Sequence, residues 1–207
     1  MSSRTAACDR HSFAGGATVS RRPAAYHRRV KRTRFLLTGF LGWASAAGAP
    51  YAATSGQATF EYRVTLVNVK GTVEGVISAV DLNTDDLAAT TGTVTVPLSG
   101  LKTGNSLRDS HTRGALGTGE FPNATFKLGR LTGGRLTAGQ TLATTASGQL
   151  TVKGVSRPIS APVKATLSGS KVNVSTQFKF NPLDYGVRYP GGADTITVNV
   201  EFVLTVR

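Results

Sequence analysis

ITVNVEFVLTVR, residues 196–207, is the stretch of the sequence that most clearly indicates the fold. Its apolar residues occupy every second position from Ile196 to Val206, and most positions between them are polar, such as Thr197 and Glu201. An alternation with a period of two places one face of a strand on an apolar core and the other face in water. Val and Thr, which are frequent in the segment, favour strand over helix. The sequence therefore predicts a β-strand that is packed on one side.

The same alternation recurs upstream, from residue 54 onward, and turn sequences rich in Gly, Pro and Ser separate the runs. Regularly spaced antiparallel strands predict a sandwich or a barrel, and a barrel leaves no exposed edge strands. We therefore expect an all-β fold, an eight-stranded antiparallel β-barrel. The eight expected strands are residues 57–67, 71–83, 91–99, 123–131, 139–152, 155–167, 171–180 and 194–206.

Some residues that are expected to point into this barrel are small. An eight-stranded barrel is just wide enough for side chains or for one small ligand. Small inward residues leave volume that destabilises a dry core. Either a ligand fills this volume, or large partners such as Phe178 and Phe202 do, and the sequence leaves both alternatives open. The small residues are Ala143, Gly148, Ala161 and Ala165.

The positive charge of the chain is concentrated near its N-terminus. The sequence has 24 Lys and Arg against 11 Asp and Glu, a formal net charge of +13. Residues 1–53 hold nine of the basic residues and one acid, so +8 of the excess lies in this arm. The charges of residues 54–207 are scattered and do not form the basic stripe of a nucleic-acid-binding surface. We therefore expect no nucleic-acid partner.

The arm has the organisation of a targeting segment. Basic residues 28–34 precede the apolar run FLLTGFLGW, residues 35–43, and small residues follow. This order is that of a secretory signal, and the apolar run is shorter than the roughly 20 residues of a spanning helix. A retained membrane anchor is the alternative. We assign residues 1–53 to a basic arm with a secretory signal and residues 54–207 to a barrel domain, with cleavage within about 48–54 and a periplasmic or secreted location.

One segment between the third and fourth expected strands lacks the period of two. Asn105 suits a helix N-cap and Gly117 suits a helix end. Leu107, His111 and Ala115 are spaced by four residues and share one face of a helix. The sequence predicts a short helix near residues 105–116, in a position to cover a barrel mouth.

This helical segment and two later segments resemble the YceI-like family. The resemblance extends over about residues 57–207, nearly the whole expected barrel domain. The first expected strand departs from the family pattern, because QATFEY, residues 57–62, lacks the family's His and Ser. The matching segments are TGNSLRDSH (103–111) with FPNATF (121–126), GQLTVKGVSRP (148–158) and FNPLDYGV (180–187).

The resemblance implies a lipocalin-like barrel with one short helix over a rim. Several members of the family hold a long isoprenoid chain, a polyprenyl lipid or isoprenoid quinone, in a hydrophobic channel, and secretion to the bacterial periplasm is usual. We therefore expect a protein that binds, carries or sequesters such a lipid, with no other cofactor. Transient contact with a membrane is compatible with this function. The alternative is a ligand-free periplasmic stress or interaction protein whose barrel is filled.

The helical segment supplies the candidate residues for a ligand head group. Arg108 suits a pyrophosphate through bidentate hydrogen bonds, and His111 or Asn105 suits a quinone carbonyl. Asp109 completes the set. In the alternative interpretation, Asp109 caps or pairs locally and Arg108 anchors the helix to the barrel rim. The expected contacts to the ligand tail are Val64, Leu66, Val96, Phe126, Val163, Phe178, Val198, Val200 and Phe202.

We expect neither catalysis nor a metal site. The polar residues of the helical segment do not include a nucleophile paired with a base. The chain has one Cys, Cys8, and three His, which are too few for a cysteine-based or histidine-rich metal site.

Overall fold

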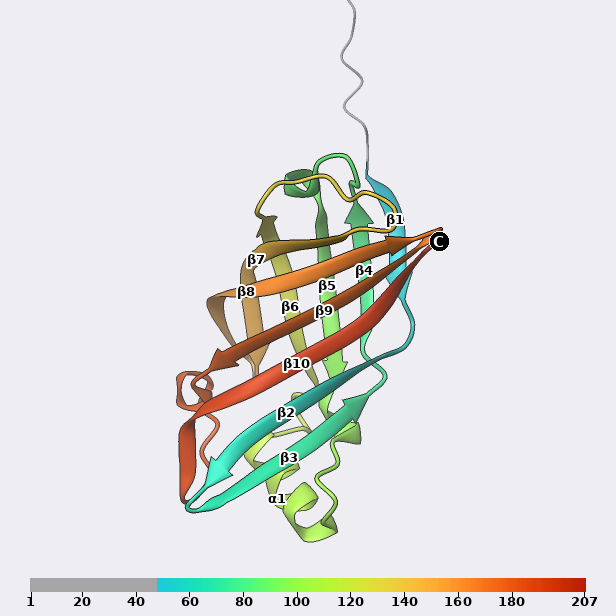
Figure 1. The fold of residues 1–207 in the computed structure, drawn as a ribbon. Coiled ribbons are helices and arrows are strands. Elements are labelled where there is room, and N and C mark those ends of the chain that lie inside the picture. Colours follow the sequence, from blue (N-terminus) through green and yellow to red (C-terminus); the bar gives the residue numbers. More distant parts are fainter. Residues whose placement is uncertain (1–47) are drawn as a thin grey trace, which may run out of the picture. The chain divides into compact units, whose positions relative to one another are not determined.

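The computed structural model describes residues 48–207, and Figure 1 shows them as a strongly bent antiparallel sheet. The strands are β1 (Ala49–Ala53), β2 (Gly56–Val64), β3 (Val67–Glu74), β4 (Ile77–Leu82), β5 (Thr91–Pro97), β6 (Asn123–Leu131), β7 (Thr141–Val152), β8 (Val155–Ser168), β9 (Lys171–Phe180) and β10 (Gly192–Val206). The helix is α1 (Ser106–Leu116), and the short 3-10 helices are η1 (Leu87–Ala89), η2 (Leu98–Gly100) and η3 (Pro182–Tyr185).

Eight of the strands close into a barrel. Their order is β1-β4-β5-β6-β7-β8-β9-β10, every neighbouring pair is antiparallel, and β10 pairs again with β1. The closing ladder joins Tyr51 to Val206 and Ala52 to Thr205. The hairpin β2–β3 extends the wall beyond β1, because β2 also pairs with β10 (Figure 1). The expected eight-stranded antiparallel barrel is confirmed.

Two expected strands are each interrupted. The run 57–67 stops at Val64, and the run 71–83 divides into β3 and β4 at Gly75, whose φ of +79° a strand cannot continue. The N–H of Val76 donates to the carbonyl of Gly56 at 3.1 Å, so the breaks β1/β2 and β3/β4 lie side by side. The sheet bends sharply there. The β-branched residues on either side of Gly75 favour strand, so the sequence pattern does not reveal the break.

The barrel begins earlier than the sequence indicated. Residues 49–53, which we had expected in the signal segment, form β1 between β4 and β10. Tyr51, Ala52 and Ala53 are buried, so this strand belongs to the core. The boundary between arm and barrel therefore moves from residue 54 to Ala49. Small alanines at a strand start look the same as the small residues of a cleavage region. The rest of the expected signal lies outside the described residues.

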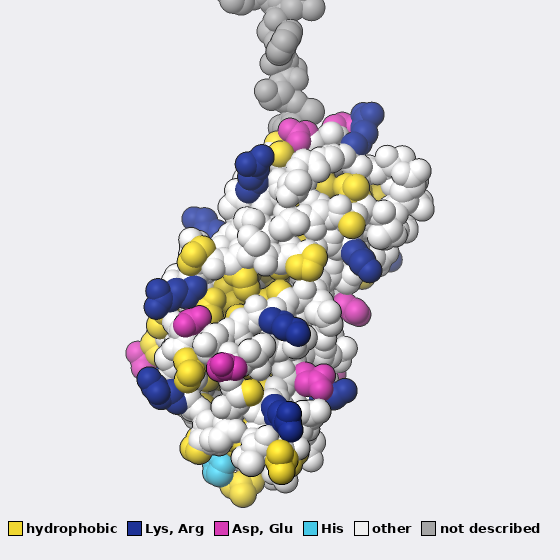
Figure 2. Space-filling model, turned by 60° about the vertical axis from the view of Figure 1, so that its left-hand side comes forward, with side chains coloured by type: hydrophobic (Ala, Val, Ile, Leu, Met, Phe, Trp, Pro, Cys, Tyr) yellow, Lys and Arg dark blue, Asp and Glu magenta, His cyan; other side chains and the backbone are white. Residues whose placement is uncertain are grey.

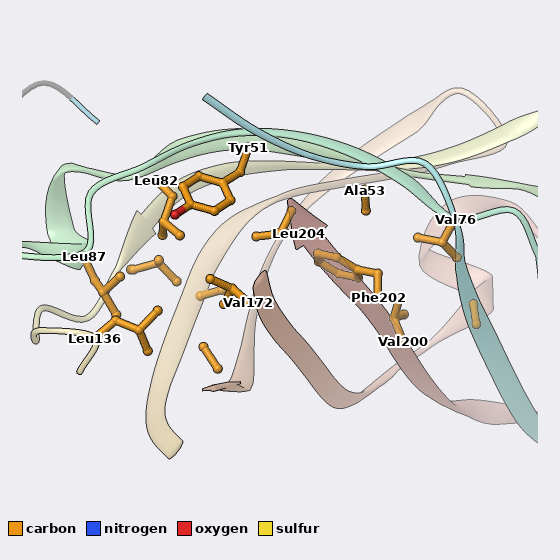
Figure 3. Packing of buried hydrophobic residues seen from close by; sticks show 14 of the residues in the cluster. Tyr51, Ala53, Val76, Leu82, Leu87, Leu136, Val172, Val200, Phe202 and Leu204 are labelled. Carbon is orange, nitrogen blue, oxygen red and sulfur yellow. The ribbon is translucent and has the colours of Figure 1, made fainter. Parts of the chain in front are cut away.

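The barrel end that carries η1 is closed by packed side chains. Leu87 of η1 and Leu136 of the β6–β7 connection are both buried there, beside Leu82 and Val172 (Figure 3). The N–H of Leu136 donates to Thr84 at 2.7 Å and the N–H of Leu87 donates to Gly134 at 3.0 Å. These bonds hold the connection over the end of the barrel.

The helix α1 lies at the opposite end (Figure 1). The Asn105 side chain accepts a hydrogen bond from the N–H of Arg108 at 3.0 Å, and Gly117 ends the helix with a φ of +65°. Both expected caps are therefore confirmed. Leu107 and His111 are exposed, and Thr112 is the buried residue of the helix. No helix within residues 48–207 is long and apolar enough to cross a membrane.

Candidate functional site

The barrel encloses a cavity of about 300 Å³. Strands β2 to β10 and one face of α1 line it, almost entirely with apolar side chains. Of the residues that the structure describes, no charged one lines this cavity. Ligand pockets in proteins typically measure about 300–1,000 Å³ and are mostly apolar. The cavity is therefore large enough to accept an apolar chain.

Large side chains line the cavity without filling it. Phe60, Phe126, Phe178 and Val198 pack against the core and are nevertheless only partly buried. In a filled interior such side chains are close-packed on all sides. Figure 2 shows hydrophobic side chains in a hollow of the surface, between charged residues on the rim. The interior is therefore open, and Phe178 and Phe202 do not fill it.

Two glycines set the positions of the aromatic rings in the wall. A Cβ atom at Gly71 would lie 2.2 Å from the Phe60 ring, and one at Gly148 would lie 2.8 Å from the Phe126 ring. Each ring therefore occupies the space of the missing side chain on the neighbouring strand. The rings lie along the wall of the barrel, and this arrangement leaves the centre of the cavity free.

Seven of the nine residues expected at the ligand tail line the cavity. The exceptions are Val64 and Leu66 at the end of the β2–β3 hairpin. Leu66 is 81% exposed because Thr65 and Leu66 form the turn between the paired residues Val64 and Val67. The expectation for these two residues is wrong, because the alternation of apolar residues in the sequence extends past Val64, where β2 ends. The residues in the lining are Val96, Phe126, Val163, Phe178, Val198, Val200 and Phe202.

None of the four expected head-group residues lines the cavity. Asn105 caps the helix and His111 is exposed to solvent. Arg108 donates from Nε to Thr103 Oγ1 at 2.8 Å and from Nη2 to the Thr103 carbonyl at 2.7 Å. For Arg108 and Asp109 the structure agrees with the alternative of local, structural bonds. A head-group role at the mouth of the cavity stays a prediction.

Asp109 and Thr103 form the centre of that local network. The N–H and the hydroxyl of Thr103 donate to Asp109 Oδ1 at 2.7 and 2.5 Å. The Thr103 hydroxyl bond is the main cause that lowers the pKa of Asp109, and the backbone bond and the charges of Arg113 and Arg108 act in the same direction against the burial of the carboxylate. The carboxylate fixes the segment before α1 to the first turn of the helix.

The cavity-facing side of α1 shares only Ala115 with the expected face of Leu107, His111 and Ala115. Thr112, Ala115 and Leu116 line the cavity, and Thr112 Oγ1 lies 3.4 Å from the hydroxyl of Tyr62 on β2. Tyr62 also contacts the ring of Tyr189 edge-on, with 6.1 Å between the ring centroids. The spacing of residues 112, 115 and 116 fits one helix face, whereas Leu107 and His111, at the other end of the expected face, are exposed.

A lysine connects the three segments that carry the family resemblance. Lys153 in the β7–β8 turn donates to the carbonyl of Ala115 on α1 at 3.0 Å and to that of Gly186 after η3 at 3.2 Å. Tyr185 of η3 is buried against Phe180, with 5.2 Å between the ring centroids. Burial, with the nearby charge of Asp184, raises the pKa of Tyr185. These segments build the end of the barrel that holds α1.

Comparison with known proteins identifies the family. The model of the YceI-like domain matches residues 51–206, from within β1 to the end of β10. The chain belongs to the YceI-like family. The match of this YceI-like barrel begins at Tyr51, in agreement with β1 as part of the domain. No match was found among curated proteins.

Solved structures share the fold of this YceI-like chain at low sequence identity. BcnA of Burkholderia cenocepacia is 16% identical with a TM-score of 0.63, over 72% of this chain and 95% of that one. A polyisoprenoid binding domain from Saccharophagus degradans, implicated in plant cell wall breakdown, is 17% identical with a TM-score of 0.62, over 77% and 99%. The YceI protein of Campylobacter jejuni is 19% identical with a TM-score of 0.58, over 70% and 89%.

Proposed function

We propose that this YceI-like barrel binds a long isoprenoid chain, a polyprenyl lipid or an isoprenoid quinone, and carries or sequesters it without catalysing a reaction. The observation that supports this proposal is the open apolar cavity, whose wall side chains are left only partly buried. The fold shared with a polyisoprenoid binding domain points in the same direction. The lipid is the cargo of the protein, and no other cofactor is needed for this role.

The energetics of burial are sufficient for such a ligand. Each buried CH₂ group contributes roughly 0.8 kcal/mol, so a chain of several prenyl units offsets ordering costs of several kcal/mol. A charged contact is not required. The tail should therefore dominate the affinity, and polar residues at the rim should select the head group.

We also propose that the protein works outside the cytoplasm, in the periplasm or as a secreted protein. The basic, apolar and small-residue order of the N-terminal arm supports export. An isoprenoid carrier in that compartment takes up its cargo from a membrane.

The end of the β2–β3 hairpin is suited to contact with such a membrane. Leu66 and Val67 are 81% and 59% exposed at its tip, and the exposed Arg63 lies beside them. The N–H of Thr65 donates to the carbonyl of Gly191 at 2.7 Å, which joins the tip to the segment of the exposed Arg188. Apolar side chains flanked by arginines match an anionic bilayer surface.

The bound lipid can be identified directly. We expect native mass spectrometry of the protein purified from its own cells, followed by organic extraction, to reveal an isoprenoid. A protein that carries none, and takes up none when isoprenoids are added, would support the ligand-free alternative.

Matched substitutions test the position of the tail. Val163 lines the cavity and its neighbour Lys164 is exposed on the outer face of β8. We expect Val163→Glu to abolish lipid uptake, because a carboxylate would be buried without a partner, whereas Lys164→Glu should retain it. Circular dichroism and thermal unfolding must show that both variants fold. Full uptake by a folded Val163→Glu variant would contradict a tail at this position.

A further inference from the structure

Three hydroxyl groups provide the polar character of an otherwise apolar cavity. At the α1 end, the hydroxyl of Tyr62 lies near that of Thr112, and the ring of Tyr62 packs edge-on against the ring of Tyr189. The remaining hydroxyl-bearing residues of the lining are bonded to the backbone or turned outward by the strand pleat: Thr59, Thr90, Thr93, Thr125, Thr144 and Thr176. The polar end of a ligand therefore has one place to form hydrogen bonds inside the barrel.

The hydroxyl of Tyr62 retains the capacity to bind a ligand atom. The Thr112 hydroxyl donates its proton to the carbonyl of Arg108 at 2.8 Å. Tyr62 Oη lies 3.4 Å from Thr112 Oγ1, longer than the roughly 2.5–3.0 Å of a good O–H···O bond. The hydroxyl of Tyr189 makes no hydrogen bond to another described residue. Tyr62 is only 9% exposed, so its hydroxyl is held at a fixed position within the cavity wall.

The cations on α1 and in the β7–β8 turn are bound elsewhere. Arg108 is bonded to Thr103, and Arg113 donates to the carbonyl of Leu101 at 3.1 Å. Lys153 bridges the carbonyls at the end of α1 and after η3. None of these three side chains lines the cavity, and neither do the exposed Arg63 and Arg188 on the hairpin side. An anionic head group at the hydroxyls would be buried without a counter-charge, which is strongly unfavourable.

We infer that the polar end of the cargo is uncharged, an alcohol or a quinone carbonyl, and that it is hydrogen-bonded by Tyr62 within the Tyr62–Thr112–Tyr189 cluster. This inference rests on the proposed isoprenoid function and names its ligand class. It makes Tyr62 a specificity-determining residue and removes Arg108 from that role.

Three probes that carry the same prenyl chain separate the head groups. Geranylgeraniol, menaquinone-4 and geranylgeranyl pyrophosphate are titrated against the delipidated protein by quenching of intrinsic fluorescence. We expect the alcohol and the quinone to bind at least about tenfold more tightly than the pyrophosphate, because only the latter buries charge. Equal or tighter binding of the pyrophosphate would overturn the inference while leaving the isoprenoid function intact. Binding of none of the three would overturn both.

Conservative variants then locate the hydrogen bond. Tyr62→Phe should weaken the alcohol and the quinone about five- to tenfold, the loss of one hydrogen bond, and leave the affinity for the hydrocarbon squalene unchanged. Arg108→Gln serves as the control and should leave all affinities unchanged. If the Tyr62→Phe variant fails to fold, Thr112→Val is measured in its place and should weaken the binding of the same two ligands. An unchanged affinity for alcohol and quinone in the folded Tyr62→Phe variant would overturn the role of Tyr62.

Discussion

Asp109 shows how a residue that looks like a binding group can serve the structure instead. Its carboxylate accepts two hydrogen bonds from Thr103 and thereby holds the start of α1 against the segment before it. These bonds favour the ionised form and keep the pKa of Asp109 in the folded protein below its ordinary value of 3.8. The stabilisation is therefore fully present at a pH well above 3.8 and is lost as the pH falls through the lower folded pKa.

We expect Asp109→Asn to destabilise the protein at neutral pH and to have less effect as the medium is acidified. Urea unfolding of the wild type and the variant at several pH values between neutrality and about pH 3 measures this difference. Asp184→Asn, at an exposed carboxylate in η3, is the control. A difference between Asp109→Asn and wild type that stayed constant across the range would contradict the role of the ionised carboxylate.

The turn at Thr65 explains why two tail residues were misplaced by the sequence. Thr65 adopts a φ of +54°, a conformation that glycine or asparagine would normally signal. A β-branched residue at this position gives no such signal, so the alternation ran on through Val64 to Leu66. Inward residues in the uninterrupted strands, such as Val163 and Val198, were predicted correctly as apolar wall positions because nothing breaks the period there.

At the scale of elements, β1 is a short strand that is needed to close the barrel. It closes the gap between β4 and β10 and buries Tyr51 with its two alanine neighbours. Any cleavage that preserves the strand must therefore fall before Ala49. The sequence could predict α1 because its caps are local, but it could not predict β1, whose partners are distant in the chain.

A truncation series tests the contribution of β1 to the stability of the barrel. A chain that begins at residue 48 should fold like the intact protein, whereas one that begins at Thr54 should lose stability, on the order of 3 kcal/mol or more for Tyr51 alone. Tyr51→Ala in the longer chain separates the loss of the side chain from the loss of the strand. Chemical unfolding provides the measurement, and equal stability of the two truncations would show that β1 is dispensable.

On the scale of the whole molecule, the two ends of the barrel have different surfaces. The η1 end is sealed by Leu87 and Leu136, while the opposite region carries the cavity-lining face of α1 and the exposed hairpin tip. Cargo exchange with a membrane is therefore expected on the hairpin side. Which end of the barrel is closed by packed side chains depends on contacts between segments that are distant in the chain. No single segment of the sequence therefore predicts it.

We expect the double substitution Leu66→Ser with Val67→Ser to slow the transfer of menaquinone-4 from anionic vesicles severalfold. Its affinity for the detergent-solubilised quinone should stay unchanged, because neither residue lines the cavity. Val203→Ser, at another exposed valine on β10, is the control. Higher salt should slow the wild type as well, since Arg63 and Arg188 are then screened. Equal transfer rates for all variants would exclude membrane docking through the tip.

The ladder between β1 and β10 also constrains when the barrel can form. It joins Tyr51 to Val206, so the first strand of the barrel waits for a partner that the ribosome adds some 150 residues later. Contacts so distant in the chain form slowly, because loop closure precedes any gain from pairing. Until then β1 can pair only with β4. The topology therefore predicts that the barrel closes only after synthesis of the domain is complete.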